Sequence, residues 1–260
     1  MTQSILQTGL LAEPNVFKKL DALESTLHNV LSGTAYTIPM HPTRDIQVLT
    51  PGLHPPKKGI SLAEGQARLL HDLANIELQA MELAIRTLLQ YTEAPHPFKE
   101  QLGKIALEEG HHLKLCLRGI ESLGYQWGDW PIHTALWDCT ASEDSLLDRM
   151  LIVHCYLEGS GLDASDSILN RLSGVHSPQA DKIVRVIAKD EMGHVQFGTR
   201  WYTQFCKELG TSPDDDFKIR MAKLAHQLPD RREKINRSLR LKAGFSESQI
   251  QTLQDFQNQL

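Results

Sequence analysis

The chain has 260 residues, a formal net charge of −5, 41% hydrophobic residues and 23% charged residues, which are ordinary values for a globular protein. The negative charge gives no general reason to expect a nucleic acid or an anionic membrane as partner. No apolar run approaches the roughly 20 residues that cross a bilayer, so that no membrane association is expected.

The cysteines and the N-terminus predict a cytoplasmic protein. Four scattered cysteines form no Cys-x-x-Cys motif, which indicates reduced thiols. Residues 1–6 contain neither a basic region nor a sustained apolar stretch, and we therefore expect no signal peptide.

The N-terminal part of the chain is predicted to form a helix and an arm. Apolar residues recur at helical spacing through residues 14–32, and Gly33 is expected to end this helix. Residues 36–60 contain five prolines but too many apolar side chains for a free linker. We expect an extended arm that lies on the protein surface.

Two pairs of long helices follow. The first pair is expected at 61–91, where residues 61–64 have a capping-box sequence, and at 97–123, where Gly124 ends the helix. The second pair is expected at 142–172 and at 177–210, with Ser177 as N-cap and Pro178 in the first turn. The aromatic segment between the pairs, 125–141, is long enough to cross a face of a helical bundle.

Shorter helices are expected after the second pair, at 214–227, 230–242 and 246–258, and no segment has the pattern of a strand. The sequence therefore predicts an all-α protein in three parts. These are an N-terminal helix and arm (1–60), a four-helix bundle (61–210) and a C-terminal helical extension (211–260).

The motif Glu-x-x-His places two metal-binding side chains on one face of a helix. Composition alone would give roughly 0.7 such motifs, and the sequence contains four. The motif at 93–96 is interrupted by a proline and is excluded. The two motifs within 108–112 overlap, so that only one of them can face a core. This leaves one motif within residues 108–112 that can face the core, and a second motif formed by Glu191 and His194.

The two helix pairs repeat the same polar residues. The matching residues stand 81 or 82 positions apart: Glu77 with Glu158, Glu109 with Glu191, and His112 with His194. Another acid follows the first glutamate of each pair by five residues, Glu82 and Asp163. One glutamate from each of two helices and Glu-x-x-His from each of the other two is the ligand set of ferritin-like di-iron carboxylate bundles. The sequence thus predicts a ferritin-like bundle with six metal ligands.

Carboxylates of this kind bridge two hard cations, and one imidazole completes the coordination of each ion. We expect two metal ions. Iron is the favoured metal, and manganese or a mixed iron–manganese pair are the alternatives. A single glutamate on an amphipathic helix is usually solvated, and a site that has lost its metal is a further alternative. Four buried and unpaired carboxylates would be very costly, however, and a pair of cations offsets that cost.

Further motifs surround these residues: Leu70-His71, 76–80, Gly128-Asp129-x-Pro131-x-His133, Leu136-Trp137, Leu157-Glu158, Gly161-Leu162-Asp163, Asp190-Glu191-x-Gly193-His194-Val195 and Ala243-Gly244-Phe245. From about residue 50 to the C-terminus, the chain resembles an uncharacterised ferritin-like family, a domain of unknown function. That family is related at fold level to di-iron hydroxylases, including the tRNA-modifying hydroxylase. The resemblance implies the metal site but no substrate.

Two acids next to the ligands are expected to orient the histidines. In di-iron bundles, an acid at the place of Asp190 reaches the free ring nitrogen of the opposite histidine, here His112. By the same pattern, Glu108 should approach His194, although the di-iron pattern usually has Asp at the position of Glu108. The alternative for both is an exposed acid.

Other residues near the candidate ligands are expected to have structural roles. His154 and Cys116, each one turn from a candidate ligand, are expected to line the core rather than bind metal. Tyr156 should point elsewhere, and we assign it no radical role. Gly159 and Gly161 each cost near 1 kcal/mol in a helix interior. A cavity, a π-bulge or close helix packing would explain them.

Two functions from different classes fit this pattern. The first is a di-iron oxidoreductase or oxygenase that uses dioxygen, a small-molecule substrate and an electron donor that the sequence does not identify. The second is an iron-binding ferroxidase or store, and a bundle with a vestigial site is a weaker third. About a hundred residues lie outside the bundle and would obstruct cage packing, which favours the enzyme as a monomer or homodimer.

The analogy with the tRNA-modifying hydroxylase rests on residues 218–242, which carry nine Lys or Arg and two acids. This stretch lacks the interleaved aromatic residues of a base-stacking surface. We favour a solvated helical face and expect no nucleic acid as partner.

Overall fold

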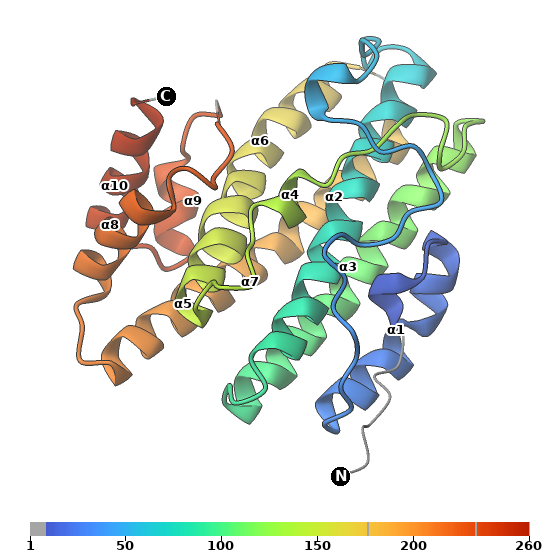
Figure 1. The fold of residues 1–260 in the computed structure, drawn as a ribbon. Coiled ribbons are helices and arrows are strands. Elements are labelled where there is room, and N and C mark those ends of the chain that lie inside the picture. The colour runs from blue at the N-terminus through green and yellow to red at the C-terminus, as the bar shows by residue number, and fades with distance from the viewer. Residues whose placement is uncertain (1–8, 176, 232, 260) are drawn as a thin grey trace. The chain divides into compact units, whose positions relative to one another are not determined.

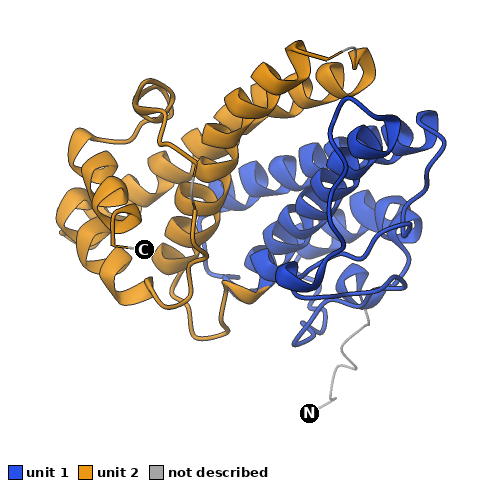
Figure 2. Cartoon of the chain, turned by 90° about the horizontal axis from the view of Figure 1, so that it is seen from above, with its two compact units in different colours: residues 1–137 blue, residues 138–260 orange. Residues whose placement is uncertain are grey.

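The computed structural model describes residues 9–175, 177–231 and 233–259, and the chain within these ranges is helical and without strands (Figure 1). It divides into two compact units, residues 1–137 and 138–260 (Figure 2). Each unit contains one of the two duplicated helix pairs. The predicted all-α class is confirmed. Residues 1–6, on which the expectation of no signal peptide depends, lie outside the described ranges.

None of the helices in the described part of the chain combines the length and the apolar character that crossing a membrane requires.

Unit 1 is built on a helical hairpin. Its two long helices, α2 (Ala63–Gln90) and α3 (His96–Ser122), pack along each other, and α1 (Val16–Leu31) packs against both. Gly110 permits the contact of α1 with α3, because a Cβ there would lie 2.4 Å from Cδ2 of Leu23. The remaining elements of the unit are η1 (Leu10–Ala12), η2 (Pro51–Leu53) and α4 (Ala135–Asp138).

A buried carboxylate fastens the N-terminal part of the chain to this hairpin. Glu82 of α2 has no exposed side-chain surface, and its Oε1 lies 2.8 Å from Nζ of Lys19 and 2.8 Å from Nη1 of Arg44. Lys19 also donates to the carbonyl of Leu10. Burying an ion requires such partners. The arm at 36–60 is thus held against α2, and η2 is the only helical element among its residues, all of which the structure describes.

Polar side chains spaced one turn apart on α2 hold the segment 125–137. The bonds join His71 to the amide of Gly128, Asn75 to the carbonyl of His133, and Gln79 to the amides of Leu136 and Trp137. An isolated parallel bridge between Val48 and Ile132 ties the arm to the same segment. The segment therefore lies along α2 and ends in the short helix α4.

Unit 2 contains a long, irregular helix that is paired with α7. The long helix consists of α5 (Leu146–Arg149), the π-helical η3 (Met150–Glu158) and α6 (Gly159–Ser173), and it packs against α7 (Pro178–Glu208). Ser177 is the N-cap of α7 and Pro178 is its first residue, as predicted. The helices α8 (Pro213–Leu224), α9 (Arg237–Lys242) and α10 (Glu247–Gln257) follow.

Arg240 of α9 holds the π-helical part of the long helix. Its buried guanidinium donates from Nη1 to the carbonyl of Cys155 at 2.8 Å and from Nη2 to Oδ2 of Asp163 at 2.7 Å. A Cβ on Gly159 would lie 2.0 Å from Nη1, so that this close approach requires a glycine. Close packing thus explains Gly159. It does not explain Gly161, where a Cβ would have nothing within 4 Å.

Three predicted helix boundaries are wrong. The capping box at Ser61 does not form, because this residue belongs to a turn and Leu62 becomes the N-cap without a side-chain bond. The third long helix begins at Leu146, four residues later than predicted, because Asp144 accepts a backbone bond that holds a turn. The helix predicted at 230–242 is confined to α9 within the described residues.

Asp148 of α5 is expected to stabilise the protein in a pH-dependent way. Burial alone would raise the pKa of this carboxyl, but hydrogen bonds from Ser145, Arg220 and Lys223 outweigh burial and lower the pKa from 3.8 to about 2. Because the folded-state pKa is depressed, the contribution is complete above pH 3.8 and is lost as the pH falls through about 2.

We therefore expect Asp148→Asn to lower the free energy of unfolding by about 2 kcal/mol at pH 7, with the difference from the original chain shrinking at pH 2.5. Urea unfolding at the two pH values measures this difference. Asp215→Asn, which changes an exposed acid of α8, serves as the control and should cost less than about 1 kcal/mol. A loss for Asp148→Asn that is equal at both pH values would contradict the role of its charge.

Candidate metal centre

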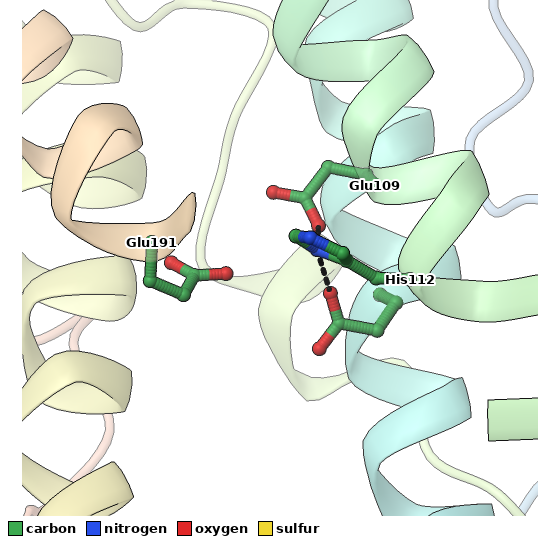
Figure 3. A group of neighbouring side chains, drawn as sticks. Glu109, His112 and Glu191 are labelled. Carbon is green, nitrogen blue, oxygen red and sulfur yellow. Dashed lines mark hydrogen bonds and ion pairs between the residues drawn. The ribbon is translucent and has the colours of Figure 1, made fainter. Parts of the chain in front are cut away.

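Unit 1 brings three of the predicted ligands together. Glu77 lies in the middle of α2, and Glu109 and His112 lie one turn apart on α3 (Figure 3). Nδ1 of His112 is 3.3 Å from Oε2 of Glu77 and 3.5 Å from Oε2 of Glu109. None of the three side chains is more than 3% exposed. The pairing of α2 with α3 at their midpoints therefore produces a buried cluster of two carboxylates and one imidazole.

Only one of the two overlapping motifs at 108–112 is buried, as expected. Glu109 and His112 are buried, whereas Glu108 and His111 are exposed. Only the motif formed by Glu109 and His112 faces the interior of the hairpin.

The electrostatics of this cluster suit a cation. Burial raises the pKa of Glu77, and the neighbouring carboxylate of Glu109 raises it further, because two like charges would otherwise share a site with little water. Burial alone would lower the pKa of His112, but its hydrogen bonds with Glu109 and Glu77 outweigh burial and raise it. The metal-free cluster thus retains protons, and a divalent cation would supply the compensating charge in their place.

Cys116, one turn beyond His112, is a poor ligand. Its side chain is fully buried, and burial together with the carboxylate of Glu77 raises the pKa of the thiol well above its ordinary value. Metals bind the thiolate, which supports the predicted place of Cys116 in the core. All four cysteines of the chain are buried and free.

Unit 2 brings the matching three residues together. Glu158 is the last residue of η3, and Glu191 (Figure 3) and His194 lie one turn apart on α7. Nδ1 of His194 is 3.8 Å from Oε1 of Glu191, and the ligand atoms of Glu158 and His194 lie within 4.8 Å of each other. The three side chains are at most 12% exposed. The duplication seen in the sequence thus extends to the local geometry of each unit.

Glu158 has a partner whose role the sequence analysis missed. Nδ1 of His154 lies 2.6 Å from Oε2 of Glu158, and the His154 ring packs edge-on against Phe197 with 5.1 Å between ring centroids. His154 does line the core, as predicted. The four-residue spacing to Glu158 was the signal that could have shown the hydrogen bond.

Tyr156 points away from these residues, as predicted. Its hydroxyl donates to the carbonyl of Pro229 at 2.7 Å, and its ring packs edge-on against Phe256.

The duplication also includes the second acid of each helix pair. Glu82 binds Lys19 and Arg44 in unit 1, and Asp163 binds Arg240 in unit 2. In both units, a buried acid five residues after a candidate ligand therefore binds a cation from outside the helix pair. This charge pairing braces the helix that carries the ligand.

Each unit offers two carboxylates and one imidazole at buried or nearly buried positions, which are donors that suit divalent iron or manganese. The remaining claims relate residues of different units and stay predictions. They are the convergence of all six ligands on one point, the bridging roles of Glu109 and Glu191, and the pairing of Asp190 with His112 and of Glu108 with His194.

Four of the nine basic residues at 218–242 form ion pairs within unit 2. Ion pairs join Arg220 to Asp148 and Asp216, Lys223 to Asp148, Arg237 to Glu247, and Arg240 to Asp163. These contacts reduce the positive charge that the stretch can offer to a polyanion.

An open hollow of about 820 Å³ lies beside α6 in unit 2, and its lining includes Asp163, Asp166 and Arg237 but none of the six candidate ligands. A catalytic metal site would require a substrate pocket that reaches the metals, and such a pocket stays a prediction.

Comparison with known proteins identifies a family but no activity. The family described as "Protein of unknown function (DUF455)" matches residues 12–251. An uncharacterized protein of Haemophilus influenzae is 28% identical over 216 residues, which cover 79% of this chain and 73% of that protein. No solved structure matches the chain.

Proposed function

The chain belongs to the DUF455 family of proteins of unknown function, and from its own residues we propose that it is a non-haem di-metal carboxylate protein. The observation that carries the proposal is the buried cluster of Glu77, Glu109 and His112, repeated in unit 2 by Glu158, Glu191 and His194. A purely structural role would not require two carboxylates to be buried side by side, because their mutual repulsion opposes folding.

For such a site, the two duplicated helix pairs would assemble into a ferritin-like bundle. The carboxylates of Glu77, Glu109, Glu158 and Glu191 would then hold the two ions, and His112 and His194 would complete the ligand set. The internal duplication supports this assignment, since the same three residue types recur at matching helix positions.

We propose an oxidoreductase rather than an iron store. Two iron ions at such a site would supply the electrons for reducing dioxygen. The chain's own residues would hold the ions and exclude water from them, since the side chains of Glu109, His112 and His194 are at most 1% exposed. The segments outside the two helix pairs are packed against them, as the bonds from α2 to residues 128–137 and from Arg240 to η3 show. Segments packed in this way favour an enzyme that is a monomer or a dimer, because they would obstruct the packing of chains into a storage cage.

Aerobic iron loading separates the enzyme from the store. Protein loaded with ferrous iron without oxygen should consume dioxygen in a stoichiometric amount when air is admitted, and should retain about two irons per chain. Size-exclusion chromatography should show a monomer or dimer. Tens of irons per chain in a large shell would overturn the enzyme proposal in favour of iron storage.

A pair of neighbouring histidines provides the control for this experiment. His112→Ala removes a buried candidate ligand and should abolish rapid dioxygen consumption, whereas His111→Ala changes an exposed residue of the same helix and should leave it intact. Equal loss in both variants would assign the effect to α3 and not to the site.

The alternative of a tRNA-modifying hydroxylase is tested on the same sample. We expect little or no salt-sensitive retention of tRNA, because Arg220, Arg237 and Arg240 are engaged in ion pairs within unit 2 and residues 218–242 lack interleaved aromatic side chains. Strong retention that weakens with salt would favour the RNA substrate.

A further inference from the structure

We call the three candidate ligands of each unit a half-site: Glu77, Glu109 and His112 in unit 1, and Glu158, Glu191 and His194 in unit 2. The two half-sites differ in the hydrogen bonds that hold Glu77 and Glu158. In unit 2, His154 and Glu158 lie four residues apart within the π-helical η3, and Nδ1 of His154 is 2.6 Å from Oε2 of Glu158. In the duplicated pattern, position 73 corresponds to position 154, and it is occupied by Leu73, which offers no hydrogen bond to Glu77. The two duplicated helix pairs therefore carry chemically different residues at this position.

The position of His154 is fixed from the facing helix. A Cβ on Gly198 of α7 would lie 2.4 Å from Cβ of His154, so that the glycine lets the backbone of η3 approach closely. Gly198 follows His194 by four residues and thus lies on the same face of α7. The ring of Phe197 closes another side of the imidazole. His154 has little freedom to turn away from Glu158.

The π-helical geometry is itself supported from outside the helix pair. Arg240 donates to the carbonyl of Cys155, next to His154, and reaches past Gly159, next to Glu158. In contrast, α2 is α-helical through Glu77. The described hydrogen bond of Glu77 is with His112, itself a candidate ligand, so that this bond must be exchanged when a metal binds.

Resting on the proposed function, we propose that His154 is a positioning residue for Glu158 and makes the half-site of unit 2 the stronger of two unequal metal sites. The ring donates its Nδ1–H to one oxygen of Glu158, and the other oxygen would remain available to hold the ion. Among the described residues, Glu77 of unit 1 has no hydrogen-bond donor other than the candidate ligands. Two ions therefore bind in two steps, the first of them in unit 2.

A titration of the metal-free chain with Mn²⁺, followed by electron paramagnetic resonance of the free ion, tests this. The wild-type chain should bind in two steps of different affinity. His154→Leu should weaken the tighter step by about 10–100-fold and leave the other unchanged. His154→Asn, whose amide N–H takes the place of Nδ1–H, should restore much of the loss. A merely structural role would not distinguish Leu from Asn in this way.

The outcomes distinguish a failure of this proposal from a failure of the proposed function. Absence of Mn²⁺ binding to the wild-type chain would overturn the proposed function itself. Two ions bound with one common affinity would overturn only the inequality of the half-sites, and this result needs no variant. Equal weakening of both steps in His154→Leu would likewise overturn the positioning role, provided that circular dichroism shows a folded variant.

Discussion

Arg240→Met is expected to lower the free energy of unfolding by about 3–5 kcal/mol, because it removes one partner of a buried ion pair. The side chains of Arg240 and Asp163 are each 2% exposed, and the guanidinium also satisfies the carbonyl of Cys155. Without Arg240, the carboxylate of Asp163 keeps only the backbone amide of Asn236 among its described partners. Methionine fills part of the space but supplies no donor.

Urea unfolding followed by circular dichroism measures this loss, and the same short helix provides the matched control. Arg237 of α9 also forms an ion pair, with Glu247, but the side chains of both are more than half exposed. Exposed pairs contribute about 0–1 kcal/mol, so that Arg237→Met should be nearly neutral. Equal losses in the two variants would show that burial of the Arg240 pair is not what stabilises unit 2.

Glu77→Gln is expected to have opposite effects on the metal-free and the metal-loaded protein. Burial and the neighbouring Glu109 raise the pKa of Glu77, so that this carboxyl must take up a proton on folding at neutral pH, which destabilises the metal-free fold. The neutral amide should therefore stabilise the metal-free chain by about 1–3 kcal/mol. The same change removes a ligand, so that stabilisation by added metal should fall sharply.

Thermal unfolding with a chelator and with added Mn²⁺ measures the two effects. Glu121→Gln, which changes an exposed acid of α3, should have little effect under either condition. If Glu77 served only to hold His112 in place, Glu77→Gln would destabilise the protein under both conditions. That result would contradict the assignment of Glu77 as a ligand.

The sequence predicted the long helices well because their signals are local. Gly124 and Gly210 end α3 and α7 with positive φ angles of 82° and 70°, as their positions after the last apolar residues indicated. The duplication likewise revealed the two clusters, because it needs only residue types at helical spacing. Burial then distinguished His112 from the adjacent His111.

The sequence could not predict features that depend on contacts distant along the chain. The two glycines did suggest a π-bulge as one alternative, but the π-helical η3 is held by Arg240, 82 residues after Glu158, and no local pattern marks that contact. The failed capping box at Ser61 has a local origin instead, since residues 59–62 form a turn through the bond from the Leu62 amide to the Gly59 carbonyl. Gly159 and Gly161 look alike in the sequence, but only Gly159 has a neighbour that excludes a Cβ.

The metal content of the chain purified from its own host tests the central claim most directly. Mass spectrometric metal analysis should find about two ions per chain, with iron as the expected metal. The double variant Glu109→Ala/Glu191→Ala should retain almost none, whereas Glu100→Ala/Glu208→Ala, at exposed positions of the same two helices, should retain both. A chain that holds no metal after purification and after loading with ferrous iron, or that binds metal equally in both double variants, would contradict the proposed di-metal site.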